Sequence, residues 1–163
     1  MTAGSDKAPD PQQLTRKVAL LAGMMTGAHV ALMITLGLRL GLYRTLASAG
    51  AVTSDDLARL TSLQERWLRE WLRGQAAAAI LEYRGDERFE LSPEVAALLG
   101  DEDSLSYMGG NFASLPLRAG RLHDLPQAFR TGIGFTWDDR GVEGASSTEG
   151  LFRNWYRHVL VPV

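Results

Sequence analysis

The feature that most constrains this chain is an apolar run close to its N-terminus. Residues 20–38, LLAGMMTGAHVALMITLGL, carry no formally charged side chain, and with His29 neutral the uncharged run extends back to Val18. About 20 apolar residues in a helix are enough to cross a bilayer. Gly23 and Gly27 have the small-xxx-small spacing that lets membrane helices approach closely. The run is therefore either a membrane span or a helix that other protein must cover.

The composition favours a soluble globular protein. The chain has 163 residues, 45% hydrophobic and 22% charged, with a net charge of −2 and a pI near 5.9, which are ordinary values for such proteins. They give no bulk attraction to nucleic acid or to anionic membranes. The absence of cysteine excludes disulfides, thiolate zinc sites and cysteine nucleophiles. The three histidines are far apart, so we expect no metal ligands. We also expect no secretory signal and a cytoplasmic location.

The positions of glycine and proline, which break helices and strands, divide the chain into four parts. We expect a flexible N-terminal arm at 1–13 and dimerisation helices at 14–50. Glycines at 23, 27, 37 and 41 should split the second part into two or three helices. A winged helix-turn-helix is expected at 51–100. The last part, 101–163, should hold further helices.

The segment 51–100 is the most readable part. Thr53 is a good N-cap for a helix whose Leu57, Ala58 and Leu60 should face inward, and Ser62 with Glu65 predicts an S-x-x-E capping box for a second helix. The apolar period of that second helix includes a tryptophan at 67. ILEYR and RFELS then alternate around GDE, which indicates a β-hairpin. The expected fold is mainly α: a winged helix, meaning a helix-turn-helix plus a β-hairpin wing, with extra N- and C-terminal dimerisation helices.

Beyond residue 92 the pattern loosens. Pro93 should begin a helix. Residues 104–131 should be helical in pieces, with breaks near Gly109–Gly110 and at the two prolines, 116 and 126. We expect 132–150 to be rich in loops, followed by an amphipathic helix, LFRNWYRHVLVPV, with residues 151, 155 and 159 on one face.

A winged helix suggests DNA binding, with the second helix in the major groove. Arginines at 66, 69 and 73 in that helix alternate with Glu65 and Glu70. The wing carries Arg84 and Arg88 among four acidic residues, which DNA phosphates would repel. We therefore do not expect DNA binding.

Catalytic patterns are weak. GIGFTW has Trp137 where a dinucleotide loop needs its third glycine, and no strand precedes it. The acidic pairs Asp55–Asp56, Asp101–Asp103 and Asp138–Asp139 are explained by helix capping or by polar loops. No nucleophile elbow is present. We assign no catalytic, cofactor-binding or metal-binding residue.

One aromatic group could line an apolar pocket for a small-molecule substrate, with a histidine as its polar group. The alternative is that these side chains belong to the core. The candidates are Phe112, Phe135, Trp137, Trp155, Tyr156 and His158.

Four segments together carry a resemblance to a known family: LGLYRTLA, TSDDLARLTSLQERWLREWLRGQAAAAILEY, FELSPEVAALL and AFRTGIGFTWDD. From about Thr15 to Val163 the chain resembles the N-terminal region of bacterial two-domain class I S-adenosylmethionine-dependent methyltransferases. The resemblance implies a winged-helix-like dimerisation domain that intertwines with its partner and supplies part of the wall of the substrate pocket. In that family a C-terminal Rossmann-like domain binds S-adenosylmethionine and carries the methyl transfer.

The sequence ends where the family's cofactor domain would begin, so the resemblance implies no catalytic residue here. We expect no cofactor in this chain and S-adenosylmethionine in full-length relatives, and we expect this chain to be inactive alone. The apolar run is then a homodimer interface rather than a membrane anchor. Two alternatives stay open: a stand-alone winged-helix regulator or ligand-binding protein, and a single-span membrane protein. The interface candidates are Leu21, Met24, Met25, Ala28, Leu32 and Leu36.

Overall fold

The computed structural model describes residues 8–136 and 138–160, without the side chains at 140, 143, 146, 147 and 151. The first seven residues of the predicted arm, Trp137 and the last three residues of the predicted C-terminal helix lie outside the described residues. The α-helices are α1 (Pro11–Arg39), α2 (Leu42–Ala49), α3 (Ser54–Thr61), α4 (Glu65–Ala77), α5 (Pro93–Val95), α6 (Gly109–Ala113), α7 (Leu115–Gly120), α8 (Leu125–Thr131) and α9 (Gly141–Trp155). The strands are β1 (Glu82–Gly85) and β2 (Arg88–Glu90). The remaining short helical turns are η1 (Ala96–Gly100), η2 (Arg121–His123), η3 (Asp138–Arg140) and η4 (Tyr156–Leu160).

The apolar run forms one uninterrupted helix. Asp10 caps α1 by accepting a hydrogen bond from the Gln12 backbone N–H at 2.9 Å, and Pro11 occupies the first helical position. The glycines at 23, 27 and 37 lie inside α1, and the chain breaks at Gly41, whose φ of 68° suits a residue without a side chain. The prediction of two or three helices is confirmed as two, with the division at Gly41 alone.

The C-terminal third of α1 is built into the core of the winged helix. The indole N–H of Trp71 donates to the backbone carbonyl of Met33 at 3.0 Å, and the ring packs edge-on against Tyr43 with centroids 5.3 Å apart. The buried Tyr43 hydroxyl donates to Gln75 Oε1 at 2.5 Å, and burial raises the pKa of this phenol. Both rings lie directly against Gly37, so α1 can approach only because this position has no side chain.

The first helix of the helix-turn-helix is capped as predicted at Thr53. Its hydroxyl accepts from the backbone N–H of Asp56 at 3.1 Å, while the Asp56 carboxylate accepts from the Thr53 N–H at 3.0 Å. This reciprocal pair is a capping box. The prediction of a capping box at Ser62 and Glu65 is wrong. Ser62 closes α3 in the left-handed region, φ 59°, and Glu65 instead accepts from the Ser54 hydroxyl at 2.6 Å.

The capping box predicts a pH dependence. Hydrogen bonds from Thr53 hold the pKa of Asp56 below its usual range. Because the pKa is lower in the folded state, the stabilisation is complete above the ordinary range of an aspartate and is lost as the pH falls through the folded pKa. We expect acidification from about pH 5 to about pH 3 to destabilise the wild type more than Asp56→Asn, measured by urea unfolding at each pH. An equal loss in both proteins would contradict this role.

The predicted hairpin is confirmed as a wing. β1 and β2 pair antiparallel, with Glu82 opposite Glu90 and Tyr83 opposite Phe89. Phe89 is buried and also forms an isolated bridge with Val52, just ahead of α3. The wing is thereby tied to the start of the helix-turn-helix.

Two side chains expected on the inner faces point outward. Leu60 is 58% exposed and Trp67 is 72% exposed. Of the two leucines of α3 that were expected to face inward, only Leu57 is buried in the core. In α4 the buried stripe begins at Leu68, and since a helix turns about 100° per residue, Trp67 falls on its edge. The inward orientation of Leu60 is corrected accordingly.

The chain beyond the wing forms short helices followed by one longer one. Pro93 begins α5 as predicted, and Pro116 and Pro126 lie in the first turns of α7 and α8. The expectation of loops throughout 132–150 is wrong, because α9 begins at Gly141 despite the local glycine and serine content. Its packing on the rest of the chain outweighs weak local propensity.

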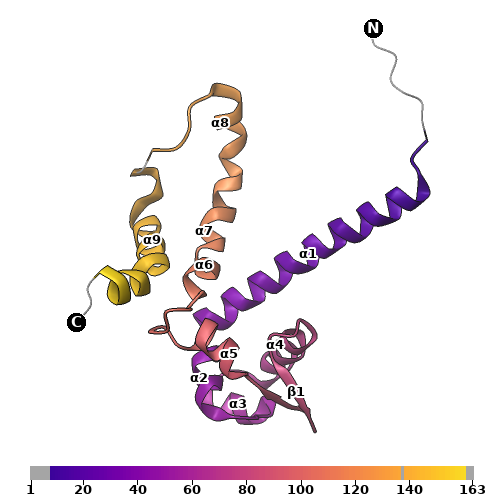
Figure 1. Cartoon of the computed structure of the whole chain (residues 1–163), viewed down its shortest axis with the longest axis vertical. Coiled ribbons are helices and arrows are strands. Elements are labelled where there is room, and N and C mark those ends of the chain that lie inside the picture. The colour runs from indigo at the N-terminus through magenta and orange to yellow at the C-terminus, as the bar shows by residue number, and fades with distance from the viewer. Residues whose placement is uncertain (1–7, 137, 161–163) are drawn as a thin grey trace.

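Figure 1 shows the resulting shape. The winged helix surrounds the C-terminal end of α1, while the N-terminal part of α1 extends away from it as a rod. The helices α6, α7 and α8 form a second column, and α9 folds back beside it. Thr35 joins the rod to the column, since its hydroxyl donates to the backbone carbonyl of Phe112 at 3.0 Å.

Candidate functional site

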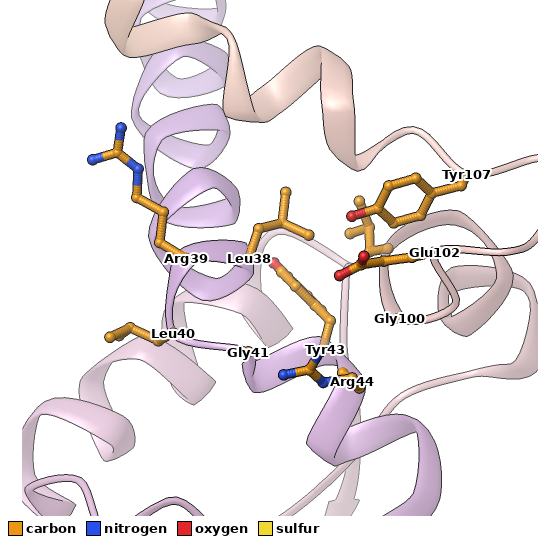
Figure 2. Close-up of a pocket in the computed structure, with 10 residues that line it drawn as sticks. Leu38, Arg39, Leu40, Gly41, Tyr43, Arg44, Gly100, Glu102 and Tyr107 are labelled. Carbon is orange, nitrogen blue, oxygen red and sulfur yellow. The ribbon is translucent and has the colours of Figure 1, made fainter. Parts of the chain in front are cut away.

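The described part of the chain contains two neighbouring cavities where α1, α2, η1 and α9 meet the segment 101–110. Their volumes are about 190 and 240 Å³. Leu38, Arg39, Glu102 and Tyr107 line both, so the two form one groove. Arg44 joins the lining of the first cavity, which Figure 2 shows in close-up.

The position of Tyr107 depends on a glycine. A Cβ placed on Gly109 would lie 2.1 Å from the Tyr107 hydroxyl and 2.2 Å from the ring carbon that bears it. Only glycine leaves room for this ring. The Gly109–Gly110 pair was predicted to break a helix; it instead begins α6 and seats the tyrosine against its first residue.

The groove brings opposite charges together. Burial and the negative charge of Glu102 raise the pKa of Tyr107, while the positive charges of Arg153 and Arg44 lower it. No ion pair joins Glu102 to an arginine among the described residues. Arg153 pairs with Glu149 at 3.2 Å, so the groove holds a phenol, the Glu102 carboxylate and the guanidinium groups of Arg39 and Arg44 without an ion pair among the described residues.

One side of the second cavity is closed by contacts of α9 and η4 with the segment 102–104. The Asn154 side-chain amide donates to the carbonyls of Glu102 and Ser104 at 2.6 and 2.7 Å. Arg157 pairs with the Asp103 carboxylate at 2.9 Å, and His158 Nε2 lies 3.0 Å from the Asp103 carbonyl. The predicted polar residue His158 thus belongs to this closure.

The predicted aromatic candidates lie outside the groove. Phe112 packs against the core, and Phe135 receives the guanidinium of Arg121 at 5.2 Å from its centroid. Trp155 and Tyr156 form an edge-on pair with centroids 5.5 Å apart and remain about half exposed. None of these four residues, nor His158, lines either cavity. Trp137 lies outside the described residues.

Sequence reasoning missed the groove because its residues come from distant segments. Arg39 and Arg44 flank the break between α1 and α2, whereas Glu102 and Tyr107 follow the wing. No short motif links them. The glycine pair beside Tyr107 was the one local signal, because adjacent glycines often mark close packing.

Two acidic pairs without an assigned catalytic role have structural partners. The carboxylate of Asp139 accepts hydrogen bonds from the backbone N–H and hydroxyl of Thr136 at 2.6 and 2.8 Å, which lowers its pKa. Asp103 is held by Arg157. No cluster of three or more potential metal-ligating side chains occurs within 8–136 and 138–160.

The rod part of α1 presents an exposed apolar surface. Its exposed large side chains include Leu21, Met24, Met25, Leu32 and Leu36, each between 43% and 61% exposed. By length and composition α1 could cross a membrane: an 18-residue window has a mean hydropathy of 1.8, with 11% of it buried. A single such helix near an N-terminus is weak support for a span, because helices of soluble proteins pass the same test.

The arginines of the winged helix other than Arg66 pair with the chain's own carboxylates. Arg69 pairs with Glu65 at 2.6 Å and Arg73 with Glu87 of the wing at 2.9 Å. Arg84 pairs with both Glu82 and Glu90. A phosphate backbone would have to displace these partners.

Comparison with known proteins agrees with this fold. The family model of the Rv2258c-like winged HTH domain matches residues 28–101. The matched segment, residues 28–101, is similar to the Rv2258c-like winged helix-turn-helix domain. Its first residues therefore belong to the C-terminal half of α1, which matches the burial of that part of the helix in the winged-helix core. No curated protein matches the sequence significantly.

Solved structures extend the likeness beyond the Rv2258c-like domain. Mitomycin 7-O-methyltransferase MmcR is 20% identical with a TM-score of 0.68, and 90% of this chain covers 46% of that one. The dimethyltransferase RosA from Streptomyces davawensis is 22% identical with a TM-score of 0.62, and the match covers 93% of this chain and 46% of RosA. Human N-acetylserotonin methyltransferase, solved with SAM, is 17% identical with a TM-score of 0.62. The match covers 92% of this chain and 43% of the human protein. At these identities the likeness shows the fold.

The chain spans about half the length of the solved relatives it matches. The predicted mainly α winged-helix fold, with added helices at both ends, is confirmed. The predicted resemblance to the N-terminal region of methyltransferases is confirmed as a likeness of fold.

Proposed function

We propose that this chain is the dimerisation and substrate-recognition domain of an S-adenosylmethionine-dependent methyltransferase architecture. The observation that carries the proposal is the apolar rod of α1, left uncovered on a fold that makes up about half of several solved methyltransferases. A second copy of the chain covers this surface in a homodimer. Symmetric pairing is the commonest way in which a soluble protein buries such a face.

The burial of α1 argues for a protein partner rather than a bilayer. Ile34, Thr35 and Gly37 are buried in the protein. The uncharged part left outside, residues 18–33, is shorter than the roughly 20 residues that a helical span needs. At Gly23 and Gly27 an added Cβ would meet nothing within 4 Å, so a second helix can approach closely there.

Substrate recognition is proposed for the aromatic candidates Phe112, Phe135, Trp137, Trp155, Tyr156 and His158, which would form one wall of a pocket completed by further protein. Trp155 and Tyr156 support this because they are paired and half exposed near the end of α9. An aromatic pair with free faces suits a flat, apolar methyl acceptor.

The residues present do not fit S-adenosylmethionine. A cofactor loop of the Rossmann type follows a parallel strand and opens a helix. Within the described residues the strands form a single two-stranded antiparallel sheet, and Gly132 of the GIG segment ends a helix, α8. In the proposed architecture the cofactor is therefore held by residues other than these 163.

A cofactor titration tests this point. We expect calorimetric titration of the 163-residue chain with S-adenosylmethionine to give no binding tighter than about 100 μM, because within 8–136 and 138–160 no glycine-rich loop connects a parallel strand to the N-terminus of a helix. Low-micromolar binding would contradict the proposal. The folded state of the same sample is checked by circular dichroism.

The proposal also places the chain in the cytoplasm. We expect it to be released from lysed cells without detergent and to stay in the supernatant after ultracentrifugation. Recovery only in detergent would favour the membrane alternative. The DNA-binding regulator is disfavoured by the ion pairs of Arg69, Arg73 and Arg84 with the chain's own carboxylates; salt-dependent binding to a defined duplex would restore it.

A further inference from the structure

The groove beside Tyr107 has a charge pattern that the dimerisation role does not use. Arg39 and Arg44 line it, and neither makes an ion pair within the part of the chain that the structure describes. In contrast, Arg69 and Arg84 of the winged helix lie against their own carboxylates. Guanidinium groups without such a partner are well suited to receive a carboxylate.

Glu102 supplies the opposite charge in the same groove. It lines both cavities together with Arg39, yet no ion pair joins it to Arg39 or Arg44. Figure 2 shows the carboxylate of Glu102 and the hydroxyl of Tyr107 on one side of α1, with Arg44 below them, whereas the guanidinium of Arg39 points toward the opposite side. The opposite charges are close enough for each to influence Tyr107 and are not in contact with each other.

Such a separation matches a ligand that carries both charges. An ammonium group suits Glu102, which accepts hydrogen bonds only, and a carboxylate suits the arginines, which donate only. The adjoining cavity of about 240 Å³ is lined by Gly109, Gly110 and Gly150, and an added Cβ at Gly150 would meet nothing within 4 Å. Tyr107, fixed against Gly109, offers a hydroxyl that can donate or accept.

We propose that the groove between α1, α2, α6 and α9 binds a small amphoteric molecule of the α-amino acid class. Its carboxylate is held by Arg44, its ammonium by Glu102, and its side chain enters the cavity beside Gly109 and Gly150. The site lies within one copy of the chain, so it does not depend on the proposed dimer.

The test is calorimetric titration of the full 163-residue chain with L-phenylalanine, 3-phenylpropionate, phenethylamine and inorganic phosphate. The second and third probes each lack one charge of the first. We expect L-phenylalanine to bind with a millimolar or tighter Kd, and each of the other three at least about tenfold more weakly, since each loses one charge-assisted contact. Arg44→Gln and Glu102→Gln should each weaken L-phenylalanine binding by about tenfold.

Arg66→Gln is the matched control. Arg66 is exposed on α4, away from the groove, and its substitution removes the same charge as Arg44→Gln. It should leave binding unchanged. Unaltered binding in Arg44→Gln or Glu102→Gln would overturn the proposal, as would the absence of L-phenylalanine binding at about 10 mM. Phosphate or 3-phenylpropionate binding as tightly as L-phenylalanine would also overturn it, since the site would then recognise only the negative charge and not the ammonium group. The light-scattering mass of each variant reports separately on dimerisation.

Discussion

Replacing Gly37 by alanine is expected to lower the free energy of unfolding by about 1–3 kcal/mol, the usual range for overpacking a filled core. A Cβ at this position would lie 2.5 Å from a ring carbon of Trp71 and 2.8 Å from one of Tyr43. Both rings are buried, and both are fixed by hydrogen bonds, to the Met33 carbonyl and to Gln75. Neither can move aside without losing such a bond.

Gly74→Ala is the matched control for this prediction. Gly74 lies inside α4, and an added Cβ meets nothing within 4 Å. Alanine should stabilise that helix by about 0.5–1 kcal/mol. Both variants are measured by urea unfolding at one protein concentration, because dimerisation makes apparent stability depend on concentration. Equal effects of the two substitutions would show that α1 does not pack closely against Trp71.

Introducing a charge into the apolar rod of α1 is expected to weaken self-association strongly. Leu32→Glu removes an apolar side chain and places a carboxylate in the proposed interface, once from each copy. We expect the dimer Kd to rise at least about a hundredfold. Met25→Glu, about two helical turns earlier on the same face of α1, should act in the same direction. Analytical ultracentrifugation over a range of concentrations measures both.

Leu60→Glu is the matched control for the rod variants. Leu60 of α3 is 58% exposed against 50% for Leu32, so the substitution and the exposure are comparable. It lies on the winged helix rather than on α1, and it should leave the Kd unchanged. If Leu60→Glu dissociated the protein while Leu32→Glu did not, the interface would lie on the helix-turn-helix.

Local patterns in the sequence were sufficient to predict the winged helix. Thr53 was identified as a cap because its hydroxyl acts within three residues, and the hairpin followed from alternation around a short polar turn. The capping box at Ser62 failed because Glu65 is claimed by Ser54, eleven residues earlier. The capping-box pattern spans only four residues, so it cannot predict a hydrogen bond from a residue as distant as Ser54.

Features set by tertiary packing were not predictable in this way. Gly37 has the same local setting as Gly23 and Gly27, yet only Gly37 lies beneath two rings from other helices. The groove joins residues near 40, 105 and 150, and its charge separation appears only in three dimensions. The apolar surface of α1, in contrast, was predictable from composition alone.

The most direct test of the central claim is the mass of the wild-type chain in solution without detergent. The claim is that a second copy covers the rod of α1. Size-exclusion chromatography with light scattering at micromolar concentration should give twice the 17.8 kDa mass of one chain. A stable species of single-chain mass under those conditions would contradict the account.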